Sequence, residues 1–244
     1  MSSCSGSRFL PAASLSVVSP LRLPRAAAAV VFDMDGTLLD TETVHRTTMQ
    51  ATAKALGYDL SDTLFLELVG VHRDRNTVRL LDHFGAGFPF DVFYEDSDRR
   101  FEALWREGVP LRPGARALLE GLAAKGLPLA IATSTASPFA EERLAHAGLL
   151  DFFATAVTRS DVTRPKPDAE PYWLAAARLG LAAGDCVAVE DSPNGLRAAA
   201  AAGMMALLVP DLIPATVETE ALALAVLPDL AAVGALIEAT AAPR

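Results

Sequence analysis

The chain has few cysteines and little positive charge. Its 244 residues include two cysteines. Cys4 lies near the N-terminus and Cys186 lies in an apolar run, so a disulfide framework is excluded and a reducing compartment, the cytoplasm, is expected. The 21 lysines and arginines face 30 acidic residues, form no basic cluster and leave a formal net charge of -9. Nucleic-acid binding is not expected, because phosphate backbones require clustered cations.

Long apolar runs are also absent. No uninterrupted apolar stretch approaches the ~18 residues that would span a bilayer, since Gly203 and Pro210 break up the longest candidate. With 51% hydrophobic residues the chain can still bury a full core. These properties predict a soluble globular protein, a monomer or weak homo-oligomer, whose partner is a small molecule rather than a nucleic acid or a membrane.

The order of the apolar patterns predicts two kinds of structure. The run 26–32 indicates a buried strand, and four helical patterns follow it without an intervening strand. From residue 115 on, helices and short apolar strands alternate, which is typical of a parallel sheet covered by helices on both faces. The expected helices are 43–56, 61–69, 73–84, 90–106, 115–125, 138–147, 169–179, 194–202 and 229–240, and the expected later strands are 129–132, 153–158, 186–190 and 205–209.

The predicted fold class is therefore α/β, a doubly wound parallel sheet with an inserted all-helical domain. We expect a disordered tail over 1–25, the α/β core over 26–40 and 112–244, and the helical insertion, called the cap, over 41–111. The end signals of several helices agree with this division. They are Ser137 as an N-cap before Pro138, the closing glycines Gly126, Gly148 and Gly203, and the apolar face Leu230, Val233, Leu236 and Ile237 of the last helix.

Two carboxylates directly follow the first strand. Asp33 stands where the strand 26–32 emerges, and Asp35 projects the same way one pleat later. Two like charges held this close require a cation between them or a raised pKa on one of them, and either arrangement is useful for chemistry. The pair Asp35-Gly36 taken alone is equally typical of a hairpin turn.

Polar side chains also stand at the ends of the later strands. They are Thr133, Ser134 and Thr135 after the second strand, Lys166 between two prolines after the third, and Glu190 and Asp191 at the end of the fourth. Ligands of open parallel sheets gather outside the carboxyl ends of the strands, so one cleft is expected to hold all of these groups. Each has a structural explanation by itself, as a capping loop, a solvated lysine or the acidic start of a helix. Their coincidence at four strand ends favours a shared site.

These four motifs, in this order, resemble those of the haloacid dehalogenase-like (HAD) hydrolase superfamily. The helical insertion after the first motif looks like the small helical cap of the beta-phosphoglucomutase-like and sugar-phosphate phosphatase group, and the likeness covers residues 26–210. The resemblance implies a Rossmann-like core, with Asp33 as the nucleophile that accepts a phosphoryl group and Asp35 as the general acid/base. It further implies phosphate binding by Thr133, Ser134 and Lys166, and Mg²⁺ binding by Asp33, Asp35, Asp191 and Glu190.

Elementary electrostatics supports these roles. A phosphate ester that approaches a carboxylate nucleophile brings two anions together, so a divalent cation and a fixed ammonium are needed to screen them. Mg²⁺ suits the task because it uses few carboxylates together with phosphate oxygens and water. Asp33, the backbone carbonyl of Asp35 and Asp191 can supply its protein ligands. Lys166 is one of only three lysines among the 21 basic residues, which draws attention to it.

Two cap residues are candidates for substrate recognition. His45 and Arg73 match positions that face the active site in the beta-phosphoglucomutase-like group, although each is also explained as a surface side chain of an amphipathic helix. The mutase pattern has a lysine where this chain has Val69, which favours hydrolysis over isomerisation.

The expected function is a Mg²⁺-dependent phosphatase acting on a small phosphorylated metabolite, a sugar phosphate, through an aspartyl-phosphate intermediate. The first alternative is a sugar-phosphate mutase of the beta-phosphoglucomutase type. The second is a non-catalytic sensor of a phosphorylated metabolite. The intact pair of Asp33 and Asp35 argues against the sensor, because a binding module would gain by losing one negative charge beside an anionic ligand.

Overall fold

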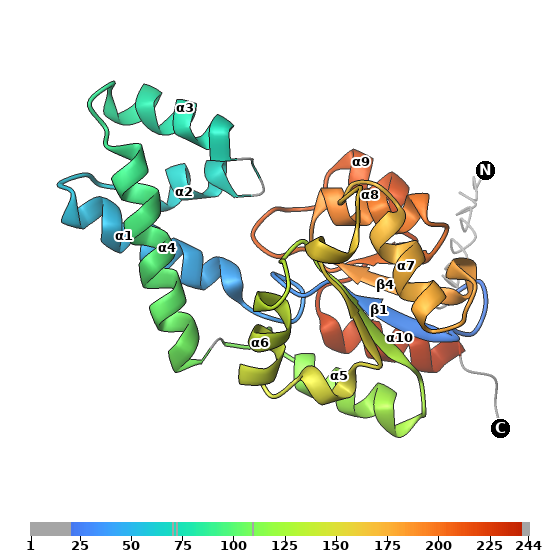
Figure 1. Ribbon diagram of the computed structural model, residues 1–244. Helices are drawn as coiled ribbons and strands as arrows, with labels where there is room; N and C mark the ends of the chain where they lie inside the picture. The colour runs from blue at the N-terminus through green and yellow to red at the C-terminus, as the bar shows by residue number, and fades with distance from the viewer. Residues whose placement is uncertain (1–20, 70, 72, 109, 241–244) are drawn as a thin grey trace, which may run out of the picture.

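A parallel six-stranded sheet forms the centre of the protein. The computed structural model describes residues 21–69, 71, 73–108 and 110–240 (Figure 1). The strands are β1 (Ala29–Phe32), β2 (Leu129–Ala132), β3 (Thr155–Val157), β4 (Cys186–Glu190), β5 (Met205–Leu208) and β6 (Ala225–Val226). They are arranged in the order β3-β2-β1-β4-β5-β6, and every pairing is parallel. The predicted fold class is confirmed.

Helices cover both faces of this sheet. The face shown downward in Figure 1 carries α5 (Ala115–Ala124) and α10 (Leu230–Thr240), and the opposite face carries α7 (Glu170–Arg178) and α8 (Pro193–Ala201). The remaining core helices are α6 (Phe139–His146), α9 (Val217–Leu222) and the short 3₁₀ turns η1 (Leu150–Phe152), η2 (Arg159–Asp161) and η3 (Ala183–Asp185). None of the described helices combines the length and the apolarity needed to cross a membrane.

The two faces differ in the size of their side chains. Successive residues of a strand point to opposite faces, so Phe32 and Ile131 pack toward α5 and α10, whereas Val31 and Ala132 pack toward α7 and α8. Small residues on the α7 and α8 side allow alanine-rich helices to approach the sheet closely. Bulky residues on the other side fill the wider space under α5 and α10.

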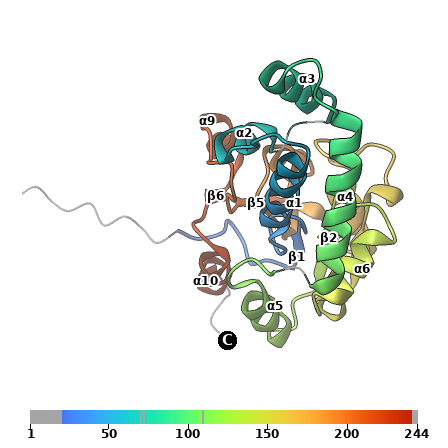
Figure 2. The ribbon, with the colours of Figure 1, turned by 90° about the vertical axis from the view of Figure 1, so that its left-hand side faces the viewer.

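The insertion between β1 and α5 is entirely helical among its described residues. It consists of α1 (Thr41–Ala55), α2 (Asp62–Leu68), α3 (Arg73–Phe84) and α4 (Phe90–Glu107). Helices α1 and α4 lie side by side, and this unit stands beside the core (Figures 1 and 2). It has an apolar cluster of its own around Leu80, Phe88 and Phe93. We call these four helices the cap, and the predicted domain boundaries stay predictions.

The chain leaves and re-enters the core along two adjacent segments. The Asp40 N–H donates to the Pro110 carbonyl at 2.8 Å, and the Arg112 N–H donates to the Leu38 carbonyl at 2.9 Å. The side chain of Asp40 then accepts a hydrogen bond from the Thr43 N–H and caps α1. These antiparallel contacts fix the point from which the cap extends.

Several local expectations need correction. Helix α6 begins at Phe139, and Ser137 does not cap it, because its N–H donates to the Ser160 hydroxyl and Pro138 occupies the cap position. Strand β3 spans only Thr155–Val157, because Phe153 is the C-cap of η1 and Thr158 is the N-cap of η2. Helix α9 and strand β6 were not predicted, because six and two residues are too few to show a period.

The end of the predicted tail belongs to the core. Leu23 is buried in the cluster under the sheet, and its N–H donates to the Thr240 hydroxyl at 2.9 Å. Arg25 pairs with Asp185 at 3.1 Å. Residues 21–25 are therefore ordered against the core, and the expectation for 1–20 lies outside the described residues. The closing glycines Gly126, Gly148 and Gly203 and the buried face of α10 are as predicted.

Candidate active site

The carboxyl ends of β1, β2 and β4 meet at one cleft. Because β1 lies between β2 and β4, the chain connections run in opposite directions from this point, which is where open α/β sheets bind ligands. The cleft has a volume of about 400 Å³. Its lining includes the predicted residues Asp33, Asp35, Thr133, Ser134, Lys166 and Asp191. Glu42 and Val69 of the cap also line it.

The first motif forms a tight turn at the end of β1. Met34 is fully buried, and its carbonyl accepts hydrogen bonds from the N–H groups of Leu38 and Leu39 at 2.9 and 3.0 Å. Gly36 has φ +80°, a conformation that favours glycine, and a Cβ there would approach the Asp191 carboxyl carbon to 2.9 Å. The turn therefore lets the backbone of β1 lie directly against the carboxylate that follows β4.

Lys166 joins two carboxylates from different strands. Its Nζ lies 2.6 Å from Asp33 Oδ1 and 2.6 Å from Glu190 Oε1, and its side chain is only 5% exposed. Burial alone would lower the pKa of Lys166, but the two carboxylates outweigh it and raise the pKa above its usual range. The lysine therefore stays charged at the base of the cleft.

Glu190 does not line the cleft itself, but it pairs with Lys166, which does. It is fully buried, and Oε1 also accepts a hydrogen bond from the Tyr172 hydroxyl at 2.5 Å. The Ser192 hydroxyl donates to Oε2 at 3.0 Å. Gly195, in the first turn of α8, lies so close to this carboxyl group that a Cβ would overlap it. Both oxygens of Glu190 are thus engaged by protein groups.

Three carboxylates crowd one side of the cleft. Ligand atoms of Asp33, Glu190 and Asp191 all lie within 4.8 Å of one another. Burial raises the pKa of Asp33 to about 7, with Lys166 acting against the shift and Glu190 adding to it. Burial followed by the charge of Asp33 raises the pKa of Asp191 well above its usual value. A bound divalent cation would relieve this crowding, because oxygen-only donor sets suit hard cations.

Asp35 is held on the opposite side of the cleft. Its Oδ2 accepts hydrogen bonds from the Thr135 hydroxyl at 2.7 Å and the Thr133 hydroxyl at 3.4 Å. Arg143 Nη1 lies 3.3 Å from Asp35 Oδ1. Ser134 also lines the cleft. The two aspartates of the first motif therefore have separate partners, and burial rather than their mutual repulsion is the first cause of the raised pKa of Asp33.

The two predicted cap residues line a second cavity within the cap. His45 and Arg73 share this space of about 220 Å³ with Glu42, which also borders the cleft. Burial lowers the pKa of His45, and its ring stacks on Phe101 with centroids 4.1 Å apart. Arg73 Nη2 pairs with Asp98 at 2.7 and 2.9 Å. His45 is thus more than a surface side chain, and the charge of Arg73 already has a partner.

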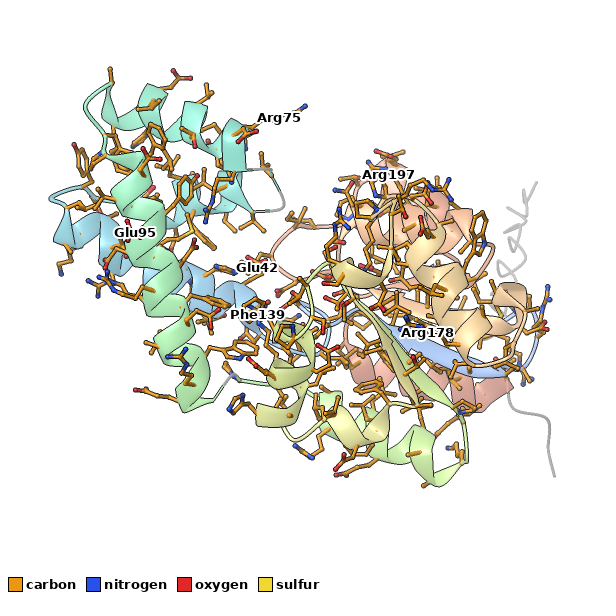
Figure 3. All side chains as sticks on the ribbon, viewed as in Figure 1. Glu42, Arg75, Glu95, Phe139, Arg178 and Arg197 are labelled. Carbon is orange, nitrogen blue, oxygen red and sulfur yellow. The ribbon has the colours of Figure 1, made fainter. Side chains whose placement is uncertain are left out.

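Glu42 and Arg143 were not predicted as site residues. Glu42 lies at the end of α1 nearest the core (Figure 3). Burial, followed by the charges of Asp211, Asp35 and Asp40, raises its pKa to about 7. Its only signal in the sequence is its place two residues after the end of the first core segment. Arg143 has no signal, because nothing in the sequence distinguishes it from the other arginines that lie on amphipathic helices of this chain.

Comparisons with known proteins agree with this geometry. A family model of haloacid dehalogenase-like hydrolases matches residues 27–203. Protein CbbY encoded on a plasmid of Cupriavidus necator H16 is 36% identical over 220 residues, which cover 83% of this chain and 85% of CbbY. The phosphorylated carbohydrates phosphatase of Thermotoga maritima is 33% identical over 180 residues, 72% of this chain and 82% of the phosphatase. The crystal structure of CbbY from Rhodobacter sphaeroides in complex with phosphate has a TM-score of 0.68 at 31% identity, covering 87% of this chain and 99% of CbbY.

The chain belongs to the haloacid dehalogenase-like hydrolases, as its four motifs predicted. Within that family the predicted enzyme class, a phosphoric monoester hydrolase, is also confirmed. The roles of individual residues are not given by these comparisons and are taken up below.

Proposed function

We propose that this protein is a Mg²⁺-dependent phosphatase that hydrolyses a small sugar phosphate in the cytoplasm through an aspartyl-phosphate on Asp33. The observation that carries the proposal is the ion pair between Lys166 Nζ and Asp33 Oδ1, 2.6 Å apart, in a cleft that Asp191 also lines. A nucleophilic carboxylate needs a fixed ammonium beside it when its target is a phosphate anion. The similarity to the phosphorylated carbohydrates phosphatase of Thermotoga maritima and to CbbY, whose crystal structure contains phosphate, supports the substrate class.

The donor set at the cleft fits a magnesium ion. Asp33 and Asp191, together with the backbone carbonyl of Asp35, would hold it, as the crowding of buried carboxylates indicates. Glu190 was also predicted as a ligand, but its oxygens already accept from Lys166, Tyr172 and Ser192, so we assign it to anchoring the lysine. When bound, the ion supplies positive charge against the phosphate oxygens.

Hydrolysis then proceeds in two steps carried by the two aspartates. A carboxylate oxygen of Asp33 attacks phosphorus, the bond to the sugar oxygen breaks, and Asp35 gives its proton to that oxygen. A water molecule next attacks phosphorus, Asp35 takes up its proton, and the bond between phosphorus and Asp33 breaks to release phosphate. Thr133, Ser134 and Lys166 hold the phosphoryl oxygens through both steps.

Two features of the cap favour hydrolysis over the mutase alternative. Val69 borders the cleft where the mutase pattern has a lysine. Arg73 is paired with Asp98, so a second phosphate group in the cap would have to compete with a carboxylate for this guanidinium. Both features suit a substrate with one phosphate and an uncharged, hydroxyl-rich remainder.

Release of inorganic phosphate tests the proposal. Purified protein is assayed with p-nitrophenyl phosphate and a panel of sugar phosphates, with Mg²⁺ or with EDTA. We expect metal-dependent release that Asp33→Asn abolishes and Asp35→Asn strongly reduces. Interconversion of sugar phosphates without free phosphate would establish the mutase instead. Tight binding without any product would establish the sensor.

A further inference from the structure

Arg143 contacts the predicted acid/base residue from a helix that no motif includes. It lies on α6 and is only 15% exposed. Its Nη1 atom is 3.3 Å from Asp35 Oδ1 and 3.3 Å from the Thr135 hydroxyl oxygen. Thr135 itself donates to the other carboxylate oxygen of Asp35 at 2.7 Å. Together, Arg143 and Thr135 engage both oxygens of Asp35 and so define the plane of its carboxyl group.

The same guanidinium group rests on the cap. Its central carbon lies 4.6 Å from the ring centroid of Trp105 and 5.3 Å from that of Phe101, both on α4. The two rings are stacked on each other and almost fully buried. Glu102, on the same helix, lies 3.8 Å from Arg143 Nη2. A planar cation over aromatic faces is a favourable arrangement that arginine provides better than lysine.

One side chain therefore touches both the acid/base residue of the core and an aromatic surface of the cap. We propose that Arg143 is a positioning residue that sets the orientation of Asp35 only while the cap is seated against α6. This inference rests on the proposed function, because it assumes that Asp35 delivers a proton to the leaving oxygen. A cap that moved away would take Trp105 and Phe101 with it and leave the guanidinium without its support.

His45 connects the aromatic surface to the cavity within the cap, where the substrate is expected to bind. His45 lines that cavity, and its ring lies 4.1 Å from the ring of Phe101, nearly parallel to it. His45, at the cavity wall, and Arg143, at the cleft, therefore both contact the ring of Phe101. Figures 1 and 2 show α6 beside the end of α4 nearest the core, where these contacts occur. The arrangement joins occupation of the cap to alignment of Asp35.

Dependence on the leaving group distinguishes this role from a purely structural one. A sugar alkoxide is a strong base and leaves only with a proton, whereas p-nitrophenolate leaves without one. The ratio kcat/KM includes only the steps up to release of the alcohol, so it reports on this proton transfer and not on later hydrolysis of the intermediate. Loss of a correctly placed general acid costs about 10²-fold or more.

The experiment compares Arg143→Ala with the unaltered enzyme on both kinds of substrate. We expect kcat/KM for the best sugar phosphate to fall about 10²-fold, while kcat/KM for p-nitrophenyl phosphate stays within about threefold of the starting value. Arg143→Lys should recover part of the sugar-phosphate activity, because it keeps the charge but lacks the planar face. Arg178→Ala, on α7 and away from the cap (Figure 3), should alter neither substrate.

A second variant tests the link to the cap. Trp105→Leu should lower the sugar-phosphate value in the same direction but less, and should add nothing when combined with Arg143→Ala, because both remove one interaction. Equal losses on both substrates in Arg143→Ala, or no loss on either, would overturn the proposal. An unaltered enzyme that releases phosphate from neither substrate would instead refute the proposed function, so the two failures are distinguishable.

Discussion

Replacing Gly195 by alanine tests whether the buried carboxylate of Glu190 determines where Lys166 lies. Gly195 lies in the first turn of α8, and an added Cβ would overlap the carboxyl carbon and both oxygens of Glu190. Non-bonded carbon atoms need roughly 3.5 Å, so the carboxyl group would have to retreat by about 1 Å or more. Its bonds to Lys166 at 2.6 Å and to Tyr172 at 2.5 Å oppose this retreat. Any movement of this carboxylate therefore shifts Lys166 relative to Asp33.

Overpacking and helix propensity together set the expected change in stability, and the displacement of Lys166 sets the expected change in rate. Overpacking a filled interior costs about 1–3 kcal/mol, and the better helix propensity of alanine returns at most ~1 kcal/mol. We therefore expect Gly195→Ala to fold with its free energy of unfolding lowered by about 1–2 kcal/mol. A displacement of ~1 Å at a group that positions the substrate costs about 10²-fold in rate. The activity should thus fall far more than the stability.

A matched glycine on another helix provides the control. Gly121 lies inside α5, and apart from its chain neighbours and the backbone of its own helix no described atom lies within 4 Å of the position that its Cβ would take. Gly121→Ala should leave phosphate release unchanged and raise the free energy of unfolding by at most ~1 kcal/mol. Both variants are measured by urea denaturation and by kcat/KM for a sugar phosphate. A folded Gly195→Ala protein with the kcat/KM of the unaltered enzyme would refute the assigned role of Glu190.

Three further predictions concern the cap, the carboxylates and the metal. Arg73→Ala should raise KM for sugar phosphates about tenfold, because the loss of one charged hydrogen bond has this effect. The KM for p-nitrophenyl phosphate should not change. An equal loss of activity on all substrates would contradict a role of Arg73 in recognition. The pKa of Glu42 rises on folding from 4.5 to about 7, so the folded state binds the proton more tightly and the free energy of unfolding falls as pH rises across this window. Glu42→Gln should therefore stabilise the metal-free protein at pH 8, by at most ~3 kcal/mol, and less at pH 5; equal effects at both pH values in urea denaturation would argue against it. Mg²⁺ should raise Tm more at pH 7.5 than at pH 5.5, because the raised pKa values of Asp33 and Asp191 leave protons that compete with the ion at low pH; an equal or larger rise at pH 5.5 in a thermal scan would be inconsistent with binding at these carboxylates.

The parallel sheet could be predicted because its strands are continuous apolar runs bounded by clear turn residues. Each of β1, β2, β4 and β5 is fully buried, and its sequence is apolar throughout except for Glu190 at the end of β4. Strand β6 pairs only with β5 at the edge and has one exposed residue of its two, so it leaves no such run. The end of the tail was misjudged because Leu23 lies in a short segment of alternating leucines, prolines and arginines that shows no helical or strand pattern, and its tertiary contacts hold it.

The candidate site was predictable to the extent that its residues follow strands. Asp33, Lys166 and Asp191 converge because parallel strands bring their carboxyl ends to one edge, which the order of elements already implies. Arg143 and Glu42 lie on helices, where the face that meets the cleft depends on how α6 and α1 are rotated and docked. That rotation is decided by packing between cap and core, and no local pattern encodes it.

The adjacent crossings between core and cap have a consequence for how this architecture can be altered. Hydrogen bonds at 2.8 and 2.9 Å join Asp40 and Leu38 of the outgoing segment to Pro110 and Arg112 of the returning segment, respectively. The four helices are therefore inserted between two chain ends of fixed spacing. A helical unit from a relative, cut at the same pair of positions, could be transplanted without moving any strand. Substrate range can thereby diverge by exchange of a module, provided that the new module offers Arg143 an aromatic surface like that of Phe101 and Trp105.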